Sequence, residues 1–418
     1  MSIWRIRGEL PLEGSLRIHG AKNSVLPIMA AAIIAGCETR LQNCPDLSDV
    51  DASINILRHL GCEVSRERDV VNIGSDGITN CHIPHELMRE MRSSVIFLGA
   101  ILARCGEAVL STPGGCELGP RPIDLHLAGL RALGAEITEH GGNILCRVGK
   151  LRGARINLAV PSVGATENVM IAACAAQGET TITNAAQEPE IVDLGGYLRA
   201  LGAEVAGDGT STITVSGFRP KKSVEHRVMP DRIVASTMLS AAASAGGMVE
   251  LRGVMPETFE TVTTALQEMG CDVSRGADSV TLRRYKPLRA GKPISTKPYP
   301  GFPTDAQPTL MAAALKADGT SVFVENIFEN RFRHVGELRR LGADIRTELR
   351  VAMVTGVPHL HAAPVSATDL RGGAALVVAA LAAEGETVIH DTGHIDRGYE
   401  SLDRSLRELG ADITKEET

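Results

Sequence analysis

The octapeptide LRALGAEI at residues 130–137 recurs, with small changes, at six places along the 418-residue chain. The other five copies are LRHLGCEV (57–64), LRALGAEV (198–205), LQEMGCDV (266–273), LRRLGADI (338–345) and LRELGADI (406–413). The glycines of successive copies lie 73, 68, 68, 72 and 68 residues apart. Such a regular interval is typical of a protein built from repeats of one supersecondary unit.

Each copy predicts the end of a helix followed by the start of a strand. The apolar residues before the glycine have helical spacing, and glycine favours the left-handed conformation that ends many helices. The residues after it begin a short alternating run, which indicates a strand. We therefore expect a glycine with positive φ at all six positions.

Alanine-rich apolar helices separate the copies and are predicted to begin near Asn23, Arg92, Thr166, Asp231, Asp305 and Asp369. In NSVLPIMAAAIIA (23–35), the apolar residues surround almost the whole helix, so we expect the helix to be buried. One repeat then reads as strand, buried helix, strand, surface helix and two strands. Because one repeat cannot cover its own buried helix, we expect six repeats grouped three and three in two α/β domains.

The composition narrows the class of protein. Apolar residues make up 44% and charged residues 22%, as in globular proteins. Aromatic residues are only 3% and the net charge is −7, which argues against nucleic-acid binding. There is no signal-peptide pattern, and the apolar run at 374–383 is too short to cross a bilayer, so we expect a cytoplasmic protein without membrane association. Nine cysteines without a Cys-x-x-Cys pair predict free thiols and no zinc site.

Charged residues gather at the predicted starts of the buried helices. Lys22, Arg92 and Arg232 oppose the helix dipole there, which is unfavourable unless an anion lies between the cation and the helix. The Asn and Asp residues at such starts have an ordinary alternative role as helix N-caps. Arg331 and Arg397 follow strands, and converging guanidinium groups suit a ligand with phosphate and carboxylate groups. Solvated surface arginine is the alternative for each of them.

The segment PGGCELGPRPIDLHL (113–127) predicts a glycine- and proline-rich loop that carries Cys116. With Arg121 nearby, the pattern is typical of a reactive thiol, while an incidental surface thiol fits it equally well.

Together these motifs resemble the enolpyruvyl transferases. The residues that carry the resemblance are GAKNSVLP (20–27), MRSSVIFLGA (91–100), PGGCELGPRPIDLHL (113–127), PSVGATEN (161–168), AAQEPEIVD (185–193), PDRI (230–233), YPGFPTDAQP (299–308), ENRF (329–332) and GHIDRGY (393–399). The branch of the family that acts on UDP-N-acetylglucosamine is similar over essentially the whole chain. The branch that acts on shikimate 3-phosphate, the alternative, has no cysteine loop of this kind.

The resemblance implies a two-domain inside-out α/β barrel, in which each domain packs three buried helices inside sheets and the active site lies in the interdomain cleft. The domains would be 21–229, and 1–20 with 230–418. The implied reaction moves the enolpyruvyl group of phosphoenolpyruvate to the 3-hydroxyl of UDP-N-acetylglucosamine, the first committed step of peptidoglycan synthesis. A monomer without metal or organic cofactor would carry it out.

The resemblance also implies roles for single residues. Those that would hold phosphoenolpyruvate are Lys22, Arg121 and Arg397. Those that would contact the nucleotide sugar are Asn23, Arg92, Pro122, Ile123, Asp124, Leu125, Ser162, Val163, Gly164, Asp305 and Ile327. Cys116 would be the general acid, able to form a covalent adduct with the pyruvyl carbon, and Asp305 would take the proton from the sugar hydroxyl. Arg331, Asp369 and Arg371 would complete the site. A non-catalytic repeat scaffold that binds a partner is the alternative from another class.

Overall fold

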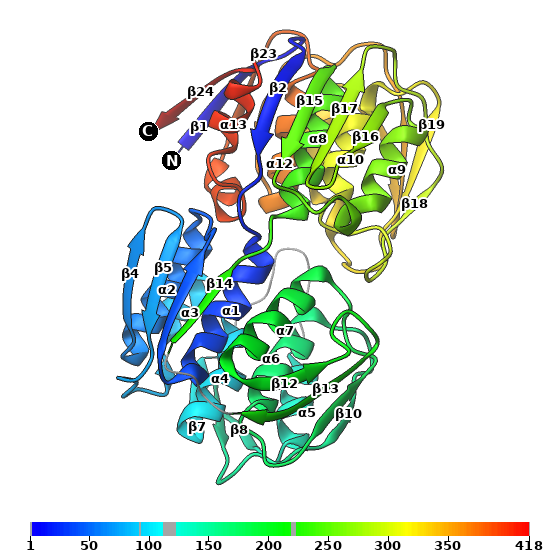
Figure 1. Cartoon of the computed structure of the whole chain (residues 1–418). Helices are drawn as coiled ribbons and strands as arrows, with labels where there is room; N and C mark the ends of the chain where they lie inside the picture. Colours follow the sequence, from blue (N-terminus) through cyan, green and yellow to red (C-terminus); the bar gives the residue numbers. More distant parts are fainter. Residues whose placement is uncertain (1, 92, 112–122, 219–222, 418) are drawn as a thin grey trace. The chain divides into compact units, whose positions relative to one another are not determined.

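The computed structural model describes residues 2–91, 93–111, 123–218 and 223–417. These residues form two compact units (Figure 1). Residues 20–229 belong to what we call the N-terminal unit, and residues 2–19 with 230–417 to the C-terminal unit, in each case for the part that the structure describes. The chain passes between the units at residues 19–20 and again at 229–230.

The N-terminal unit contains three four-stranded sheets. In strand order they are β14 (Ser223–Arg227), β3 (Glu38–Gln42), β5 (Val70–Gly74) and β4 (Glu63–Glu67); β6 (His82–Ile83), β7 (Glu107–Ser111), β9 (Asn143–Arg147) and β8 (Glu136–His140); and β10 (Arg155–Asn157), β11 (Thr180–Thr183), β13 (Thr212–Phe218) and β12 (Ala203–Ala206). The first two strands of each sheet are parallel and the remaining neighbours are antiparallel. All three sheets therefore have the same topology.

Three helices fill the core of this unit, namely α1 (Lys22–Ala35), α4 (Phe97–Cys105) and α6 (Val163–Ala173). Every residue of α1 except Asn23 is buried, as its apolar sequence predicts. The helix α4 contacts both α1 and α6. The outer helices are α2 (Ser48–Leu60), α3 (His85–Glu90), α5 (Asp124–Ala132) and α7 (Pro189–Leu201), with a 3₁₀ turn at η1 (Ser94–Ile96).

The C-terminal unit repeats this plan. Its sheets are β2 (Leu12–Arg17), β15 (Gly247–Arg252), β17 (Ser279–Arg284) and β16 (Asp272–Arg275); β18 (Ile294–Ser295), β19 (Thr320–Val324), β21 (Val351–Thr355) and β20 (Asp344–Glu348); and β22 (Pro364–Ser366), β23 (Glu386–His390), β1 (Ser2–Arg7) and β24 (Asp412–Glu417). The strand β1 lies between β23 and β24 and is antiparallel to both. The strand β2 pairs with β15, and β14 pairs with β3. In each unit, therefore, the first strand of one sheet is far along the chain from the strand with which it pairs.

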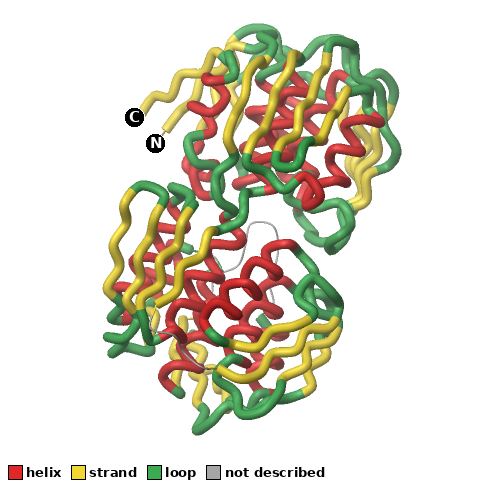
Figure 2. The backbone as a smooth tube through the Cα atoms, in the orientation of Figure 1, coloured by secondary structure: helices red, strands yellow, loops and turns green. Residues whose placement is uncertain are grey.

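Its buried helices are α8 (Arg232–Ala245), α10 (Gln307–Ala313) and α12 (Leu370–Ala380), which contact one another inside the sheets (Figures 1 and 2). The remaining helices and 3₁₀ turns are α9 (Glu260–Glu268), α11 (Val335–Arg340), α13 (Leu402–Glu408), η2 (Pro256–Phe259), η3 (Ala314–Lys316), η4 (Arg331–His334) and η5 (Thr392–Arg397).

The repeat prediction is confirmed. The glycines that end the six recurring octapeptide helices all have positive φ, from 90° to 109°: Gly61, Gly134, Gly202, Gly270, Gly342 and Gly410. Three copies fall in each unit, as the grouping of three and three requires. Within the described ranges, no helix has the length and apolar character needed to cross a membrane.

Candidate active site

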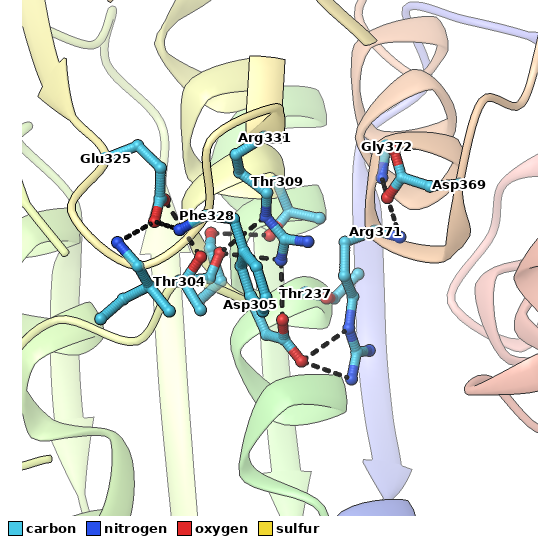
Figure 3. A network of polar contacts seen from close by, with 12 residues as sticks. Thr237, Thr304, Asp305, Thr309, Glu325, Phe328, Arg331, Asp369, Arg371 and Gly372 are labelled. Carbon is cyan, nitrogen blue, oxygen red and sulfur yellow. Dashed lines mark hydrogen bonds and ion pairs between the residues drawn. The ribbon is translucent and has the colours of Figure 1, made fainter. Parts of the chain in front are cut away.

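A carboxylate held between two buried arginines is the main polar feature of the C-terminal unit (Figure 3). Asp305 Oδ1 accepts from Arg331 Nη2 at 2.7 Å, and Oδ2 lies 3.3 Å from both Nε and Nη2 of Arg371. The two arginine side chains are 2% and 3% exposed, whereas that of Asp305 is 28% exposed. The carboxylate is thus the part of the cluster that solvent or a ligand reaches.

The first arginine is oriented by a second set of hydrogen bonds. Arg331 donates from Nη2 to the carbonyl of Thr304 at 2.9 Å as well as to Asp305. The Thr304 hydroxyl in turn donates to Glu325 Oε2 at 3.0 Å. The other oxygen of Glu325 accepts the backbone N–H groups of Ile327 and Phe328 at 2.8 and 3.0 Å. Glu325 therefore orders both the loop before Arg331 and the residue next to Asp305.

The second arginine lies at the start of α12. Its guanidinium carbon is 5.1 Å from the centre of the Tyr399 ring, and Nη1 is buried with no described hydrogen-bond acceptor. Burial alone lowers the pKa of Arg371, but Tyr399, Asp305 and Asp231 together raise it above its ordinary value. Arg371 is therefore a permanent cation with one donor still available.

Asp369 is a helix N-cap, as the alternative interpretation of the sequence predicts, whereas Asp305 is not. Asp369 caps α12, because its Oδ1 accepts the N–H groups of Arg371 and Gly372 at 3.1 and 3.0 Å. Asp305 does not cap a helix, since α10 begins at Gln307 and has Ala306 as its N-cap residue. The prediction that Asp305 begins the fifth buried helix was wrong by two residues, and this frees its carboxylate for the two arginines.

At the start of α1 the structure shows which anion accompanies the predicted cation. Lys22 Nζ lies 2.7 Å from a carboxylate oxygen of Asp49, and their side chains are only 10% and 2% exposed. Asp49 comes from α2, so an anion of the protein itself offsets the unfavourable dipole. The N-cap reading of Asn23 was wrong, because the helix already begins at Lys22 and Asn23 is exposed.

The other predicted contacts of the N-terminal unit lie at the starts of two helices. Ser162 caps α6 with its hydroxyl, and Val163 and Gly164 form the first turn of that helix. Ile123 precedes α5 directly, and Asp124 and Leu125 are its first residues. Helix starts present unsatisfied N–H groups, which suit the phosphates of a nucleotide.

Several predicted residues fall elsewhere. Arg92, Cys116, Arg121 and Pro122 lie outside the described residues. In the C-terminal unit, Ile327 is 39% exposed, and Arg397 is half-buried at the end of η5. Among the described residues, no three His, Cys, Asp or Glu side chains are grouped so that they could hold a metal ion.

Sequence reasoning missed the polar partners of these residues. They are Asp49, Thr304, Glu325, His334 and Tyr399, of which all but Thr304 are buried. The signal for Glu325 was present, because a carboxylate placed directly after an apolar strand is unusual unless it is hydrogen-bonded. The others stand within apolar helices or far along the chain from their partners, where periodicity carries no information about them.

Comparison with known proteins defines the class. The family model described as EPSP synthase (3-phosphoshikimate 1-carboxyvinyltransferase) matches residues 6–415, and the chain belongs to this family of enolpyruvyl transferases. Relatives that share nearly half of the sequence carry a more particular name. "UDP-N-acetylglucosamine 1-carboxyvinyltransferase 2" of Caldanaerobacter subterraneus is 48% identical over 99% of this chain and 100% of its own length. "UDP-N-acetylglucosamine 1-carboxyvinyltransferase 1" of Symbiobacterium thermophilum is 49% identical over 98% and 94%.

Solved structures confirm the predicted inside-out α/β fold. The enolpyruvyl transferase NikO from Streptomyces tendae has a TM-score of 0.88 at 27% identity and covers 99% of this chain and 98% of its own. EPSP synthase from Acinetobacter baumannii has a TM-score of 0.75 at 21% identity over the full length of both chains, a similarity of fold alone.

Proposed function

We propose that this chain transfers the enolpyruvyl group of phosphoenolpyruvate to the 3-hydroxyl of UDP-N-acetylglucosamine and releases phosphate. The observation that carries the proposal is the partly exposed carboxylate of Asp305 between two buried arginines, in a chain that belongs to the enolpyruvyl transferases. The names of the relatives at 48% and 49% identity support the nucleotide sugar as the acceptor.

The reaction needs an acid and a base. Phosphoenolpyruvate is a poor electrophile until its methylene carbon takes up a proton, which leaves an oxocarbenium-like carbon that the sugar hydroxyl attacks. The hydroxyl proton passes to the base as the new C–O bond forms. The tetrahedral adduct then loses a proton from its methyl group and its C–O bond to phosphate, so the enol is restored on the sugar. The acid assigned to the first step is Cys116, and the base is Asp305.

The longer contacts of one oxygen of Asp305 support its assignment as the proton acceptor. Oδ1 is engaged in a short contact of 2.7 Å with Arg331. Oδ2 lies 3.3 Å from Nε and Nη2 of Arg371, near the outer limit of N–H···O hydrogen bonds. A carboxylate oxygen has a second lone pair, so Oδ2 accepts a substrate hydroxyl without losing its arginine partner.

Cations stabilise the negative charge of phosphoenolpyruvate and of the tetrahedral adduct. We assign this role to Lys22, Arg121 and Arg397. The buried Nη1 of Arg371, which no described residue accepts from, supplies a further donor for a ligand oxygen. The acceptor contacts are assigned to Asn23, Arg92, Pro122, Ile123, Asp124, Leu125, Ser162, Val163, Gly164 and Ile327, with Asp369 orienting Arg371 through its helix cap.

The proposal places the enzyme in the cytoplasm as a monomer, at the first committed step of peptidoglycan synthesis and thus of cell-wall growth, shape and division. Sedimentation of the purified protein checks the monomer. A sedimenting dimer at micromolar concentration contradicts that part of the proposal alone.

The direct test measures phosphate release from phosphoenolpyruvate with UDP-N-acetylglucosamine, with shikimate 3-phosphate and with no acceptor. Release with the nucleotide sugar alone is the expected result. Release with shikimate 3-phosphate alone keeps the reaction and overturns the acceptor, an outcome that the description of the family model makes worth testing. No release with either acceptor favours the non-catalytic scaffold.

A second test addresses Cys116. Small epoxide phosphonates that mimic phosphoenolpyruvate are expected to alkylate this thiol, because a general acid of the reaction must face the substrate. Intact-protein mass spectrometry should show one adduct in the wild type and none in Cys116→Ser. An adduct that persists in Cys116→Ser assigns the reactive thiol to another cysteine.

A further inference from the structure

A buried hydrogen-bond network joins three segments of the N-terminal unit. Asn168 of α6, which has no exposed surface, lies at its centre. Its Oδ1 accepts the backbone N–H of Gly99 at 2.6 Å. Its Nδ2 lies 2.8 Å from the carbonyl oxygen of Val95 and 2.9 Å from Nδ1 of His126. One side chain therefore connects α6 with the chain before and within α4 and with α5.

The two backbone partners fix the orientation of the Asn168 amide. A backbone N–H only donates and a carbonyl only accepts, so Oδ1 must face Gly99 and Nδ2 must face Val95. The second hydrogen of Nδ2 then points to His126, whose Nδ1 must accept it. A neutral imidazole that accepts at Nδ1 carries its hydrogen on Nε2. Burial lowers the pKa of His126 to about 4, in agreement with a neutral ring.

The network lies next to the residues assigned to the acceptor. His126 directly follows Leu125 in the first turn of α5, and Val95 is three residues beyond Arg92. The His126 ring also lies against the first turn of α6. A Cβ added to Gly164 would be 3.0 Å from Cε1 and 3.3 Å from Nε2 of the ring. The ring position and the helix start therefore depend on each other.

We propose that Asn168 is a positioning residue of the acceptor site, which selects the Nε2–H tautomer of His126 and aligns the start of α6 with the segments that follow Arg92 and Leu125. The inference rests on the proposed function, since the acceptor residues are assigned there. A purely structural role for Asn168 predicts lower stability without any preference between the two substrates. A positioning role predicts a selective loss of affinity for the nucleotide sugar.

The substitution Asn168→Asp separates these roles. A carboxylate of the same shape cannot donate to the carbonyl of Val95 or to Nδ1 of His126, and it favours a proton on Nδ1 instead. We expect KM for UDP-N-acetylglucosamine to rise roughly tenfold, while KM for phosphoenolpyruvate changes by less than about twofold. An unchanged KM for the nucleotide sugar, or a parallel rise of both constants, overturns the proposal.

The matched control is Thr39→Val, in the same unit. It removes a hydrogen bond of 2.9 Å between the side chains of Thr39 and Tyr197, both without exposed surface. We expect a lower melting temperature and unchanged KM values for this variant. If KM for the nucleotide sugar also rises selectively in Thr39→Val, the positioning role is overturned. The loss of any buried hydrogen bond in this unit would then produce the same effect.

Nitrogen-15 NMR of histidine-labelled protein tests the tautomer without turnover. The His126 signals are identified by their loss in His126→Gln. We expect an unprotonated Nδ1 and a protonated Nε2 in the wild type, and a protonated Nδ1 in Asn168→Asp. A wild-type proton on Nδ1 overturns the inference even if the nucleotide sugar is the substrate. If NMR shows the expected tautomer but the protein does not use the nucleotide sugar, the proposed function is overturned. The role of Asn168 in positioning the acceptor site is overturned with it.

Two substitutions of the ring keep the test possible if Asn168→Asp does not fold. His126→Gln retains an N–H near the position of Nε2, whereas His126→Asn retains only a group near Nδ1. We expect His126→Gln to keep a KM for the nucleotide sugar closer to the wild-type value. Equal effects of the two substitutions contradict the proposed tautomer.

Discussion

The two units share one repeat, yet the polar groups beside their buried helices differ from one helix to another. In the C-terminal unit the groups are charged, with Asp305 between Arg331 and Arg371. At α6 of the N-terminal unit they are neutral, with Asn168 between His126 and backbone groups. The repeat thus fixes where a helix begins but not the chemistry found there. Charged groups suit proton transfer and anion binding, while a neutral network suits the alignment of a binding surface.

The largest expected effect comes from the charged side of this comparison. Asp305→Asn keeps the shape of the side chain but removes the carboxylate that we propose as the proton acceptor. We expect kcat for phosphate release to fall by about 10²–10⁴-fold. The control is Asp272→Asn in the same unit, where the aspartate is exposed and lies 3.6 Å from Arg283. A kcat within tenfold of wild type would assign the base to another residue.

The next largest effect is expected at the ion pair at the start of α1, where Lys22 is also assigned to phosphoenolpyruvate under the proposed function. Lys22→Met leaves the nearly buried Asp49 without its lysine, and loss of one partner of a buried pair costs about 3 kcal/mol in the free energy of unfolding. Adding Asp49→Asn is expected to restore most of this stability and none of the phosphate release. Urea unfolding and the phosphate assay measure the two effects. Recovery of activity in the double variant would remove Lys22 from the phosphoenolpyruvate site.

These residues also show how much of the fold and of the candidate site could be predicted from the sequence. The six octapeptides predicted the repeats and the grouping of three and three, because a helix-ending glycine leaves a local signature. The sequence also predicted that Lys22 needs an anion. It did not identify Asp49, since the contact depends on how α2 packs on α1 across 27 residues of chain. Asp305 illustrates the same limit, because only its distance from two remote arginines distinguishes it from an N-cap.

The neutral network was hidden for a different physical reason. Asn168 lies in an apolar helix. The sequence TENVM (166–170) around it is equally compatible with an exposed polar residue at this position. Only the close approach of three segments turns that position into a buried centre whose donors and acceptors are all used. Periodicity reports which face is buried, but it does not report which polar atom meets which partner.

Each unit also buries a histidine whose pKa is lowered from 6.5 to about 4, namely His126 and His334. Burial is the main cause for both, and at His334 the nearby Arg331 adds to it while Asp369 opposes it. Between pH 6.5 and 4 the unfolded chain binds more protons than the folded one, so stability falls as the pH falls and is unaffected above this window. Each histidine is expected to remove up to about 3 kcal/mol at the acid end.

Urea unfolding between about pH 7 and about pH 4 measures this loss. His126→Gln and His334→Gln should each flatten the acid dependence of the free energy of unfolding, whereas the exposed His140→Gln should leave it unchanged. If the buried-site variants retain the wild-type slope, other groups cause the acid loss.

The smallest expected effect concerns the backbone that brings the neutral network together. A Cβ at Gly99 of α4 would lie 2.4 Å from Asn168 Oδ1 and 2.5 Å from its carbonyl oxygen, so α4 and α6 approach closely only because this residue is glycine. Gly99→Ala should destabilise the protein by about 1–3 kcal/mol. Gly336→Ala is the matched control, because Gly336 also lies in a helix but has no atom within 4 Å of an added Cβ.

Gly336→Ala should leave the free energy of unfolding unchanged or raise it by about 0.5–1 kcal/mol, through the better helix propensity of alanine. The sign of the difference between the two variants tests whether the close approach at Gly99 is required. If it is, Gly99→Ala must also disturb the hydrogen bond from its own N–H to Asn168, and KM for the nucleotide sugar should rise with it. A Gly99→Ala protein with lower stability but an unchanged KM would show that the helix contact and the orientation of the Asn168 amide are independent.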